Sequence, residues 1–311
     1  MKLTFSDMRI TTAFVLVFLI VTPLEISAVS TFQESSEDLE GVSVALWTGH
    51  GALESSVIAL EYLFAWMNAT VIPTNETHIL NGGLEDIDVL VFPGGSTSSY
   101  SSSLGSEGKQ LIRDFISGGG SYFGICGGSL FGTRLRLNLF NGSYIGPTAG
   151  EGTRMMNMSV NRESSGPDLT SEPETYELLY WNSAYFSADN MTGIIPIVTY
   201  PSNGEAAMIA FHYGFGTVFL SSPHPEYEEN DDRDGTTDFD YYDDQDSEWG
   251  LLLKVTKWLV DDSPEPSTTL PPTESITDLS DRDIPEVTII YTIIGVIGVI
   301  AIITIVILKH R

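Results

Sequence analysis

Short apolar runs alternate with longer amphipathic stretches in the first half of the chain. Strand-like runs lie at 42–47, 89–92 and 122–125, and stretches with the length of a helix lie at 54–67 and 106–116. Runs of about four to eight apolar residues are typical of buried strands, whereas longer stretches with one apolar face are typical of helices. This order predicts an α/β fold, an open, mostly parallel sheet with helices on both faces, whose ligands bind at the carboxyl ends of the strands.

From about residue 176, strand-like runs follow one another without helices between them. Gly214 and Gly216 mark a turn between the last two runs, which favours antiparallel pairing. An amphipathic helix at 248–260 is expected to close the domain, and 134–171 is expected to be loop with some strand. The four runs lie at 176–181, 194–200, 206–211 and 217–220.

The first residues of the chain have the pattern of an export signal. Basic residues precede an apolar run at 10–21, and Ala28 offers a small residue at a cleavage position. This arrangement is typical of a secretory signal peptide over 1–28, which a short linker at 29–40 would follow. An uncleaved anchor is the alternative.

The other end of the chain predicts a membrane anchor. Residues 287–308 contain no charged side chain, and as a helix they would extend about 33 Å, enough for a hydrocarbon core of ~30 Å. A basic tail at 309–311 follows, and a Pro/Thr/Ser-rich stalk at 262–286 precedes the run. We therefore expect one transmembrane helix, a cytoplasmic tail and a single-pass location at the cell membrane, with the domain at 41–261 outside. A buried core helix is the alternative.

Composition limits the partners of the domain. The formal net charge of −28 repels nucleic acid, which excludes nucleic acid as a partner. The single cysteine leaves no intrachain disulfide, so the domain must be stabilised by its core. Five asparagines stand in acceptor sequences for N-linked carbohydrate, as an exported protein would use: Asn68, Asn75, Asn141, Asn157 and Asn190.

The cysteine lies in a pattern that is typical of a nucleophile. The strand-like run at 122–125 enters a Gly-x-Cys-x-Gly sequence centred on Cys126, the cysteine form of a nucleophile elbow. A sharp strand-to-helix turn needs glycines, and the N–H groups at the start of the next helix would favour thiolate over thiol. The alternative is a small buried cysteine between glycine turns.

A histidine and a carboxylate follow another buried run. The run at 217–220 leads into His224-Pro-Glu226, in which the imidazole can serve as a base and the carboxylate can orient it. Cys126, His224 and Glu226 would then be nucleophile, proton carrier and tautomer holder.

Glycines after a third run are candidates for binding an oxyanion. The run at 88–92 ends in Pro-Gly-Gly, so the N–H groups of Gly94 and Gly95 are available to a developing negative charge, with the N–H of Gly127 as second donor. His50, after the first strand, either lines the same pocket or lies in a surface loop. Trp181 is a candidate for a pocket wall or for the core.

These motifs, in this order, resemble the class I glutamine amidotransferase superfamily, and within it the amidotransferase-like domain named after the N-terminal part of biotin-protein ligase. The stretches 45–52 and 180–186 support the narrower likeness, and the resemblance covers about 41–260. It implies a flavodoxin-like sheet, and it implies roles for five residues: nucleophile Cys126, base His224, third member Glu226, and Gly95 with Gly127 at the oxyanion.

The resemblance implies a hydrolytic function. Nothing in the chain resembles the catalytic domain of a biotin ligase, so biotin ligation is not expected. We expect a cysteine hydrolase acting on a small-molecule or peptide-like amide or γ-glutamyl bond. The alternatives are a non-catalytic cell-surface module that binds a small molecule in the same pocket and, with less support, an interaction scaffold that uses the acidic face.

The acidic insert at 226–248 offers a cofactor hypothesis. Its Asp232, Asp234 and Asp238 stand at alternate positions around a turn glycine, as ligands of a calcium loop do. Tyr241 stands at the twelfth position, where such loops have glutamate. The insert therefore predicts either a weak Ca²⁺ site or a solvated, partly disordered loop, and no other cofactor is expected.

Overall fold

The computed structural model describes residues 39–228, 232–244 and 246–263. Nine of the strands in this part follow one another across a single sheet, and two shorter ones pair beside it. The order across the sheet is β2 (Thr70–Thr74), β1 (Ser43–Trp47), β3 (Val89–Phe92), β4 (Ser121–Ile125), β11 (Gly216–Ser221), β10 (Ala206–Tyr213), β9 (Ile195–Thr199), β6 (Thr153–Val160) and β7 (Thr175–Trp181). The shorter strands are β5 (Ser143–Ile145) and β8 (Tyr185–Ser187), of which β8 also pairs with β10.

The sheet has a parallel half and an antiparallel half. Strands β2, β1, β3, β4 and β11 pair in parallel, as the alternation of strands and helices predicts. From β11 through β10, β9 and β6 to β7 every pairing is antiparallel, so the sheet as a whole is mixed. Strand β4 lies between β3 and β11, and the turns that follow these three strands therefore meet at one edge of the sheet.

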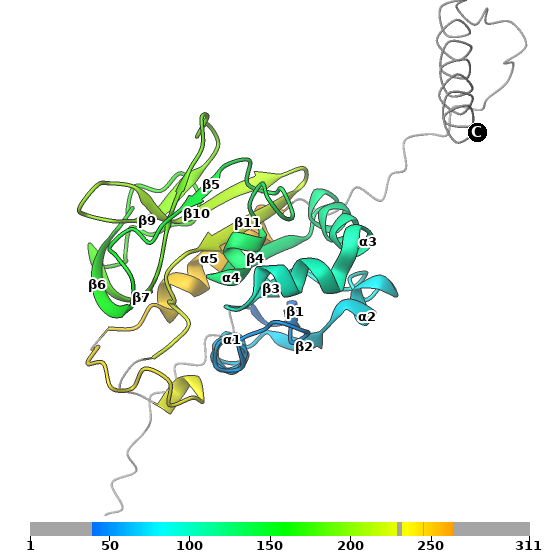
Figure 1. The fold of residues 1–311 in the computed structure, drawn as a ribbon, viewed down its shortest axis with the longest axis horizontal. Helices are drawn as coiled ribbons and strands as arrows, with labels where there is room; N and C mark the ends of the chain where they lie inside the picture. Colours follow the sequence, from blue (N-terminus) through cyan, green and yellow to red (C-terminus); the bar gives the residue numbers. More distant parts are fainter. Residues whose placement is uncertain (1–38, 229–231, 245, 264–311) are drawn as a thin grey trace, which may run out of the picture. The chain divides into compact units, whose positions relative to one another are not determined.

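Helices cover both faces of the parallel half (Figure 1). The apolar side chains of α1 (Glu54–Trp66) and α5 (Trp249–Asp261) pack on one face, and those of α2 (Glu76–Leu80), α3 (Thr97–Ser117) and α4 (Gly127–Phe131) pack on the other. Strand β1 serves both layers, because Val44 and Leu46 face the first while Ala45 and Trp47 face the second. Because helices cover both faces of the sheet, the side chains that point to either face are apolar. A buried strand is therefore a continuous apolar run in the sequence.

Helix α3 is longer than the sequence predicts. It begins after Ser96, whose side chain accepts from the N–H of Ser99, and it is interrupted at Gly105 with φ 60°. The amphipathic stretch at 106–116 is only the part after this kink. The serine-rich first part has little helical periodicity, and its Tyr100 packs against the rings of Trp47 and Phe92.

The predicted fold class is corrected in one respect, the transmembrane helix. No helix of the described residues has both the length and the apolar character to cross a membrane. Helices α1 and α5 extend about 20 Å, and the longer α3 is rich in serine and glycine. The run at 287–308, the stalk beyond 263 and the signal peptide at 1–28 lie outside the described residues. The prediction of a single-pass location at the cell membrane is therefore not supported by any helix of the described residues.

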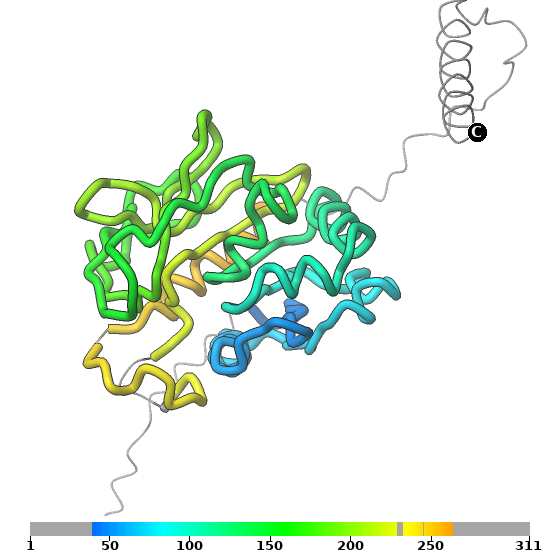
Figure 2. Tube along the Cα trace, in the orientation of Figure 1, coloured from blue at the N-terminus to red at the C-terminus, as the bar shows by residue number. Residues whose placement is uncertain are grey.

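The acidic insert is packed against the domain over its described residues. Figure 2 shows the chain passing alongside α1 between the end of β11 and the start of α5. Tyr227 and Phe239 are buried, with ring centroids 4.9 Å apart. The guanidinium of Arg233 lies 4.0 Å from the ring centroid of Trp249 and 5.0 Å from that of Trp66. A solvated loop therefore does not describe the buried Tyr227 and Phe239, whereas Asp238 and Tyr241 of the insert are exposed.

Candidate active site

Cys126 stands at the turn between β4 and α4 in a strained conformation. Its φ of 48° and ψ of −106° are rare for a residue with a side chain. Its N–H donates to the carbonyl of Ser221 at 2.8 Å, which ties the turn to the end of β11. The glycines after it are required by space, because a Cβ on Gly127 or Gly128 would lie 2.1 or 2.0 Å from the nearest backbone carbonyl oxygen. Helix α4 has only five residues, which limits its contribution to stabilising a thiolate.

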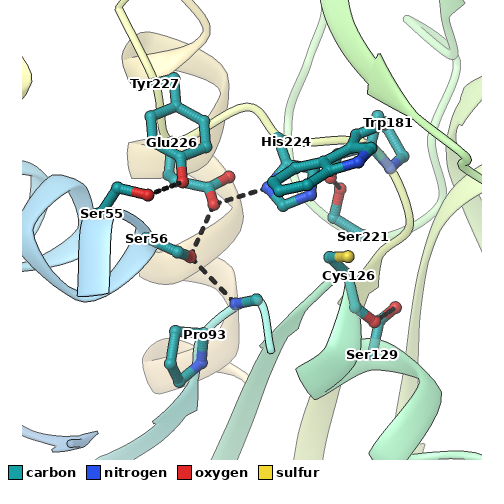
Figure 3. A network of polar contacts seen from close by, with 12 residues as sticks. Ser55, Ser56, Pro93, Cys126, Ser129, Trp181, Ser221, His224, Glu226 and Tyr227 are labelled. Atoms are coloured by element: carbon teal, nitrogen blue, oxygen red, sulfur yellow. Dashed lines mark hydrogen bonds and ion pairs between the residues drawn. The ribbon is translucent and has the colours of Figure 1, made fainter. Parts of the chain in front are cut away.

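His224 and Glu226 form a fully buried pair at the end of β11. His224 Nδ1 lies 2.9 Å from Glu226 Oε1, and neither side chain is exposed. The same oxygen accepts a hydrogen bond of 2.7 Å from Ser56 Oγ, which itself accepts one of 2.9 Å from the N–H of Gly94 (Figure 3). The carboxylate is therefore fixed from the first turn of α1 and from the turn after β3.

The imidazole of His224 is arranged to carry a proton. Burial by itself lowers its pKa, but the Glu226 carboxylate and the Cys126 sulfur outweigh burial and raise the pKa well above its usual range. Its Nε2 is buried and has no hydrogen-bond partner among the described residues. Figure 3 shows the sulfur of Cys126 close to the imidazole ring of His224. Because its pKa is raised and no other described residue bonds to Nε2, the imidazole can hold the proton of the Cys126 thiol.

A pocket of about 370 Å³ opens over the sulfur. Cys126, His224, Gly95 and Gly127 all line it. The other lining residues are Leu53, Leu130, Tyr144, Trp181 and Asn182.

The wall beside His224 comes from β7, the edge strand of the antiparallel half. The N–H of His224 donates to the carbonyl of Leu179 at 3.0 Å, as an isolated antiparallel bridge. The Trp181 ring stands 5.5 Å from the imidazole, between centroids, and is tilted by 34°. Trp181 is thus a pocket residue, one of the two alternatives that its sequence position left open.

Two of the glycines expected at the oxyanion lie where the sequence predicts. Gly95 pairs with Ala52 in a bridge whose hydrogen bonds are made by the neighbouring residues, Leu53 N–H to Gly94 O and Ser96 N–H to Gly51 O. In such a pair the N–H groups of the bridged residues point away from each other. Gly95 and Gly127 both line the pocket, and their part in binding an oxyanion stays a prediction.

Gly94 is placed differently from the prediction, and His50 follows one of its two predicted alternatives. The N–H of Gly94 is used by Ser56 and supports Glu226 instead of facing the pocket. His50 is exposed and does not line the pocket, in line with the surface-loop alternative. Closeness to a strand end in sequence does not fix the direction in which a loop residue points.

The family model described as "Biotin-protein ligase, N terminal" matches residues 42–248, more than half of the 311 residues. The chain belongs to the biotin-protein ligase N-terminal family. The family predicted from the three motifs is thereby confirmed.

Two curated relatives share parts of this family domain. A biotin–protein ligase of Schizosaccharomyces pombe is 25% identical in an alignment 221 residues long, which covers 60% of this chain and 33% of the ligase. An uncharacterized protein of Chlamydia muridarum is 27% identical in an alignment 161 residues long, which covers 46% of this chain and 62% of that protein. The chain thus spans less than two thirds of the length of either relative.

Two solved structures with low sequence identity to this chain resemble part of its fold. A glutamine amidotransferase of Thermotoga maritima has a TM-score of 0.44 at 17% identity, with 60% of this chain and 76% of that chain covered. A cytoplasmic protein of Salmonella typhimurium LT2 has a TM-score of 0.48 at 10% identity, covering 70% and 99%. Identities this low leave the activity of the family domain to be argued from its own residues.

Two of the residues predicted to bind Ca²⁺, Asp234 and Asp238, have different surroundings, because Asp234 is buried and Asp238 is exposed. The carboxylate of Asp234 accepts from the N–H groups of Glu228 and Thr236 and thereby shapes its own turn. Asp238 is exposed, and Asp232 begins the 3₁₀ turn η2 (Asp232–Asp234). In the described part of the chain, one group of carboxylates lies within 4.8 Å, and it consists of Asp244, Asp246 and Glu248. Calcium binding stays a prediction.

The asparagines predicted to carry carbohydrate are all on the surface. Each of Asn68, Asn75, Asn141, Asn157 and Asn190 is exposed. The Asn75 side chain also accepts from the N–H of His78 at the start of α2. Exposure is what an acceptor needs, and their modification stays a prediction.

Ser56 is the residue of this site that the motifs do not reveal. It is completely buried and lies 170 residues from Glu226. A signal was nevertheless present, because Ser55 and Ser56 interrupt the start of an otherwise apolar helix. Buried hydroxyl groups need partners, and two of them on one helix turn indicate contact with a polar site.

Proposed function

We propose that the domain is a cysteine hydrolase of amide-type bonds, which include amide, γ-glutamyl and peptide-like bonds. In this proposal Cys126 is the nucleophile, His224 the general base and Glu226 the residue that orients it. The observation that carries the proposal is the buried His224–Glu226 pair at 2.9 Å, beside a pocket that both His224 and Cys126 line. A residue that only packed the core would not need a positive φ at Cys126.

The chemistry follows from these positions. His224 takes the proton of the Cys126 thiol at Nε2, and the resulting thiolate Sγ attacks the carbonyl carbon of the substrate. The N–H groups of Gly95 and Gly127 stabilise the oxyanion of the tetrahedral intermediate. The imidazolium returns the proton to the leaving amine, and a thioester remains. Water then attacks the thioester, with its proton taken by His224, and releases a carboxylic acid and the free thiol.

Glu226 acts through His224 and does not touch the substrate. Its hydrogen bond to Nδ1 selects the tautomer with a basic Nε2, and its charge stabilises the imidazolium during the reaction. The position corresponds to the third member of other nucleophile–base–carboxylate sites.

The second candidate function is a non-catalytic small-molecule-binding module. The pocket of about 370 Å³ has a volume typical of such sites. A binder, however, does not need a strained cysteine beside a base that is held by a buried carboxylate. The ligase named among the relatives is matched over 33% of its length, so biotin ligation is not included in the proposal.

The rate at which iodoacetamide alkylates Cys126 tests the proposal. The chain has one cysteine, so the reaction reports on this thiol alone. In the full chain we expect rapid alkylation already at neutral pH, and a fall of about tenfold or more in the His224→Ala and Glu226→Ala variants. Hydrolysis of acyl p-nitroanilides should fall in parallel. A thiol that reacts at the same rate in all three proteins would favour the binding module.

A further inference from the structure

The pocket is built from uncharged walls. Apart from the reacting pair Cys126 and His224, the side chains that line it among the described residues are aliphatic, aromatic or amide groups. Leu53 and Leu130 contribute aliphatic surface, and Trp181 contributes a flat aromatic face beside the imidazole. No lysine, arginine, aspartate or glutamate of the described residues lines it.

The polar groups of the walls are already partly used by the protein. Tyr144 accepts a hydrogen bond of 2.7 Å from Ser222 Oγ, and burial raises its pKa above the ordinary range, so it remains a neutral phenol. The Asn182 Oδ1 accepts from the N–H of Gly152 at 2.7 Å. These bonds hold the two side chains in place without providing a charge.

An amino-acid substrate would need what these walls lack. The α-carboxylate of a glutamyl group is normally bound by arginine, lysine or several N–H groups, and its α-ammonium by a carboxylate. A charge that enters a desolvated pocket without a partner carries a large penalty. An aliphatic or aryl-alkyl group, in contrast, gains from contact with Leu53, Leu130 and Trp181.

We infer that the pocket selects an uncharged acyl group, aliphatic or aryl-alkyl, and excludes the zwitterionic end of glutamine and of γ-glutamyl compounds. This inference rests on the proposed hydrolase function and narrows its substrate class to amides of apolar carboxylic acids. The pocket of about 370 Å³ has room for a group of the size of 3-phenylpropanoyl.

A bound amide should protect Cys126 of the full chain from alkylation, and this protection tests the inference without requiring turnover. Alkylation by iodoacetamide is measured with increasing pentanamide, L-glutamine or 3-phenylpropanamide. Pentanamide and L-glutamine have the same five-carbon chain and differ in the ammonium and carboxylate groups. We expect half-protection by L-glutamine to require roughly tenfold or more the concentration of pentanamide, and 3-phenylpropanamide to protect best.

A matched pair of variants places the selectivity in the pocket. Leu53→Arg introduces a cation at the pocket wall. In this variant the concentration of L-glutamine that gives half-protection should be closer to that of pentanamide. Leu135→Arg makes the same exchange at a side chain that is 75% exposed and outside the pocket, and should leave the ratio unchanged.

The outcomes separate this inference from the proposed function. Protection by L-glutamine at or below the concentration of pentanamide, or no protection by any of the three amides, would overturn the inference. Protection in the expected order, together with no hydrolysis of pentanoyl, 3-phenylpropanoyl or γ-glutamyl p-nitroanilide, would overturn the hydrolase function and leave the pocket selectivity standing. If the γ-glutamyl compound is hydrolysed at the highest rate, the inference about the acyl group is overturned and the hydrolase function is supported.

Discussion

Ser56→Ala removes one oxygen atom that joins three parts of the site. The Ser56 hydroxyl donates to Glu226 Oε1 at 2.7 Å and accepts from the N–H of Gly94 at 2.9 Å. Glu226 Oε2 has no partner among the described residues, so Ser56 and His224 hold the carboxylate by a single oxygen. Without Ser56 the carboxylate of Glu226 can rotate about the Cγ–Cδ bond and lose its alignment with His224.

The two lost hydrogen bonds set the expected size of the effect. A bond to a charged group contributes about 1.5–3 kcal/mol and a neutral one about 0.5–1.5 kcal/mol, so the variant should lose about 2–4 kcal/mol of unfolding free energy. If about 1.5 kcal/mol of this is also lost in the transition state, kcat/KM falls roughly tenfold. The pH profile of Cys126 alkylation should change as well, because Glu226 sets the protonation of His224.

Ser55→Ala is the matched control for this variant. Its hydroxyl lies 2.9 Å from the Tyr227 hydroxyl, and the residue is also buried, so this hydrogen bond goes to Tyr227 and not to Glu226. We expect about 1 kcal/mol of destabilisation in urea unfolding and an unchanged pH profile. The reasoning is refuted if Ser56→Ala, folded at the assay temperature, keeps its alkylation rate and pH profile within about twofold of the unmodified protein.

Two further predictions concern packing and pH. Gly127→Ala puts a Cβ 2.1 Å from the carbonyl oxygen of Gly95, so urea unfolding should show a loss of about 1–3 kcal/mol together with slower alkylation of Cys126. The control Gly250→Ala, which has no atom within 4 Å of the new Cβ inside α5, should gain about 0.5–1 kcal/mol, and equal stability of the two variants would contradict the packing argument. Burial, with a contribution from the Asp246 carboxylate, raises the pKa of Asp244 to about 7. The folded state therefore binds more protons than the unfolded state between about pH 4 and 7, and its stability falls as pH rises through this range. Asp244→Asn should reduce the difference in Tm between about pH 5.5 and 7.5, and an unchanged difference would show that another group causes it.

The parts of the site that sequence reasoning reaches are those encoded within a few residues. The turn at Cys126 follows from a buried run and its glycines, and the contact between His224 and Glu226 follows from a spacing of two. Cys126 comes close to His224 because β4 and β11 are parallel neighbours, whose carboxyl ends lie at the same edge of the sheet.

Other features depend on distant partners and are not encoded locally. The role of Ser56 is set by a residue 170 positions later. Strand β6 lies in a region that was expected to be loop with some strand, because Arg154 and Asn157 interrupt its apolar pattern. Its pairing with β7, which comes later in the sequence, stabilises it as a strand. The acidic composition of the insert predicts a solvated loop, but its few aromatic residues and Arg233 hold it against α1 and α5.

The bridge between Leu179 and His224 has a consequence for how such domains diversify. The nucleophile turn belongs to the parallel half of the sheet, whereas Trp181 and the backbone carbonyl that holds His224 belong to β7, at the far end of the antiparallel half. Trp181 lies at the end of β7 and lines the pocket, whereas Tyr176, Leu178 and Tyr180 of this strand belong to the core that β3, β4 and β11 share. The fold therefore separates the reaction from the choice of substrate. An engineer who wished to change the preferred acyl group would randomise the end of β7 and the residues after it, and would leave the glycine turns untouched.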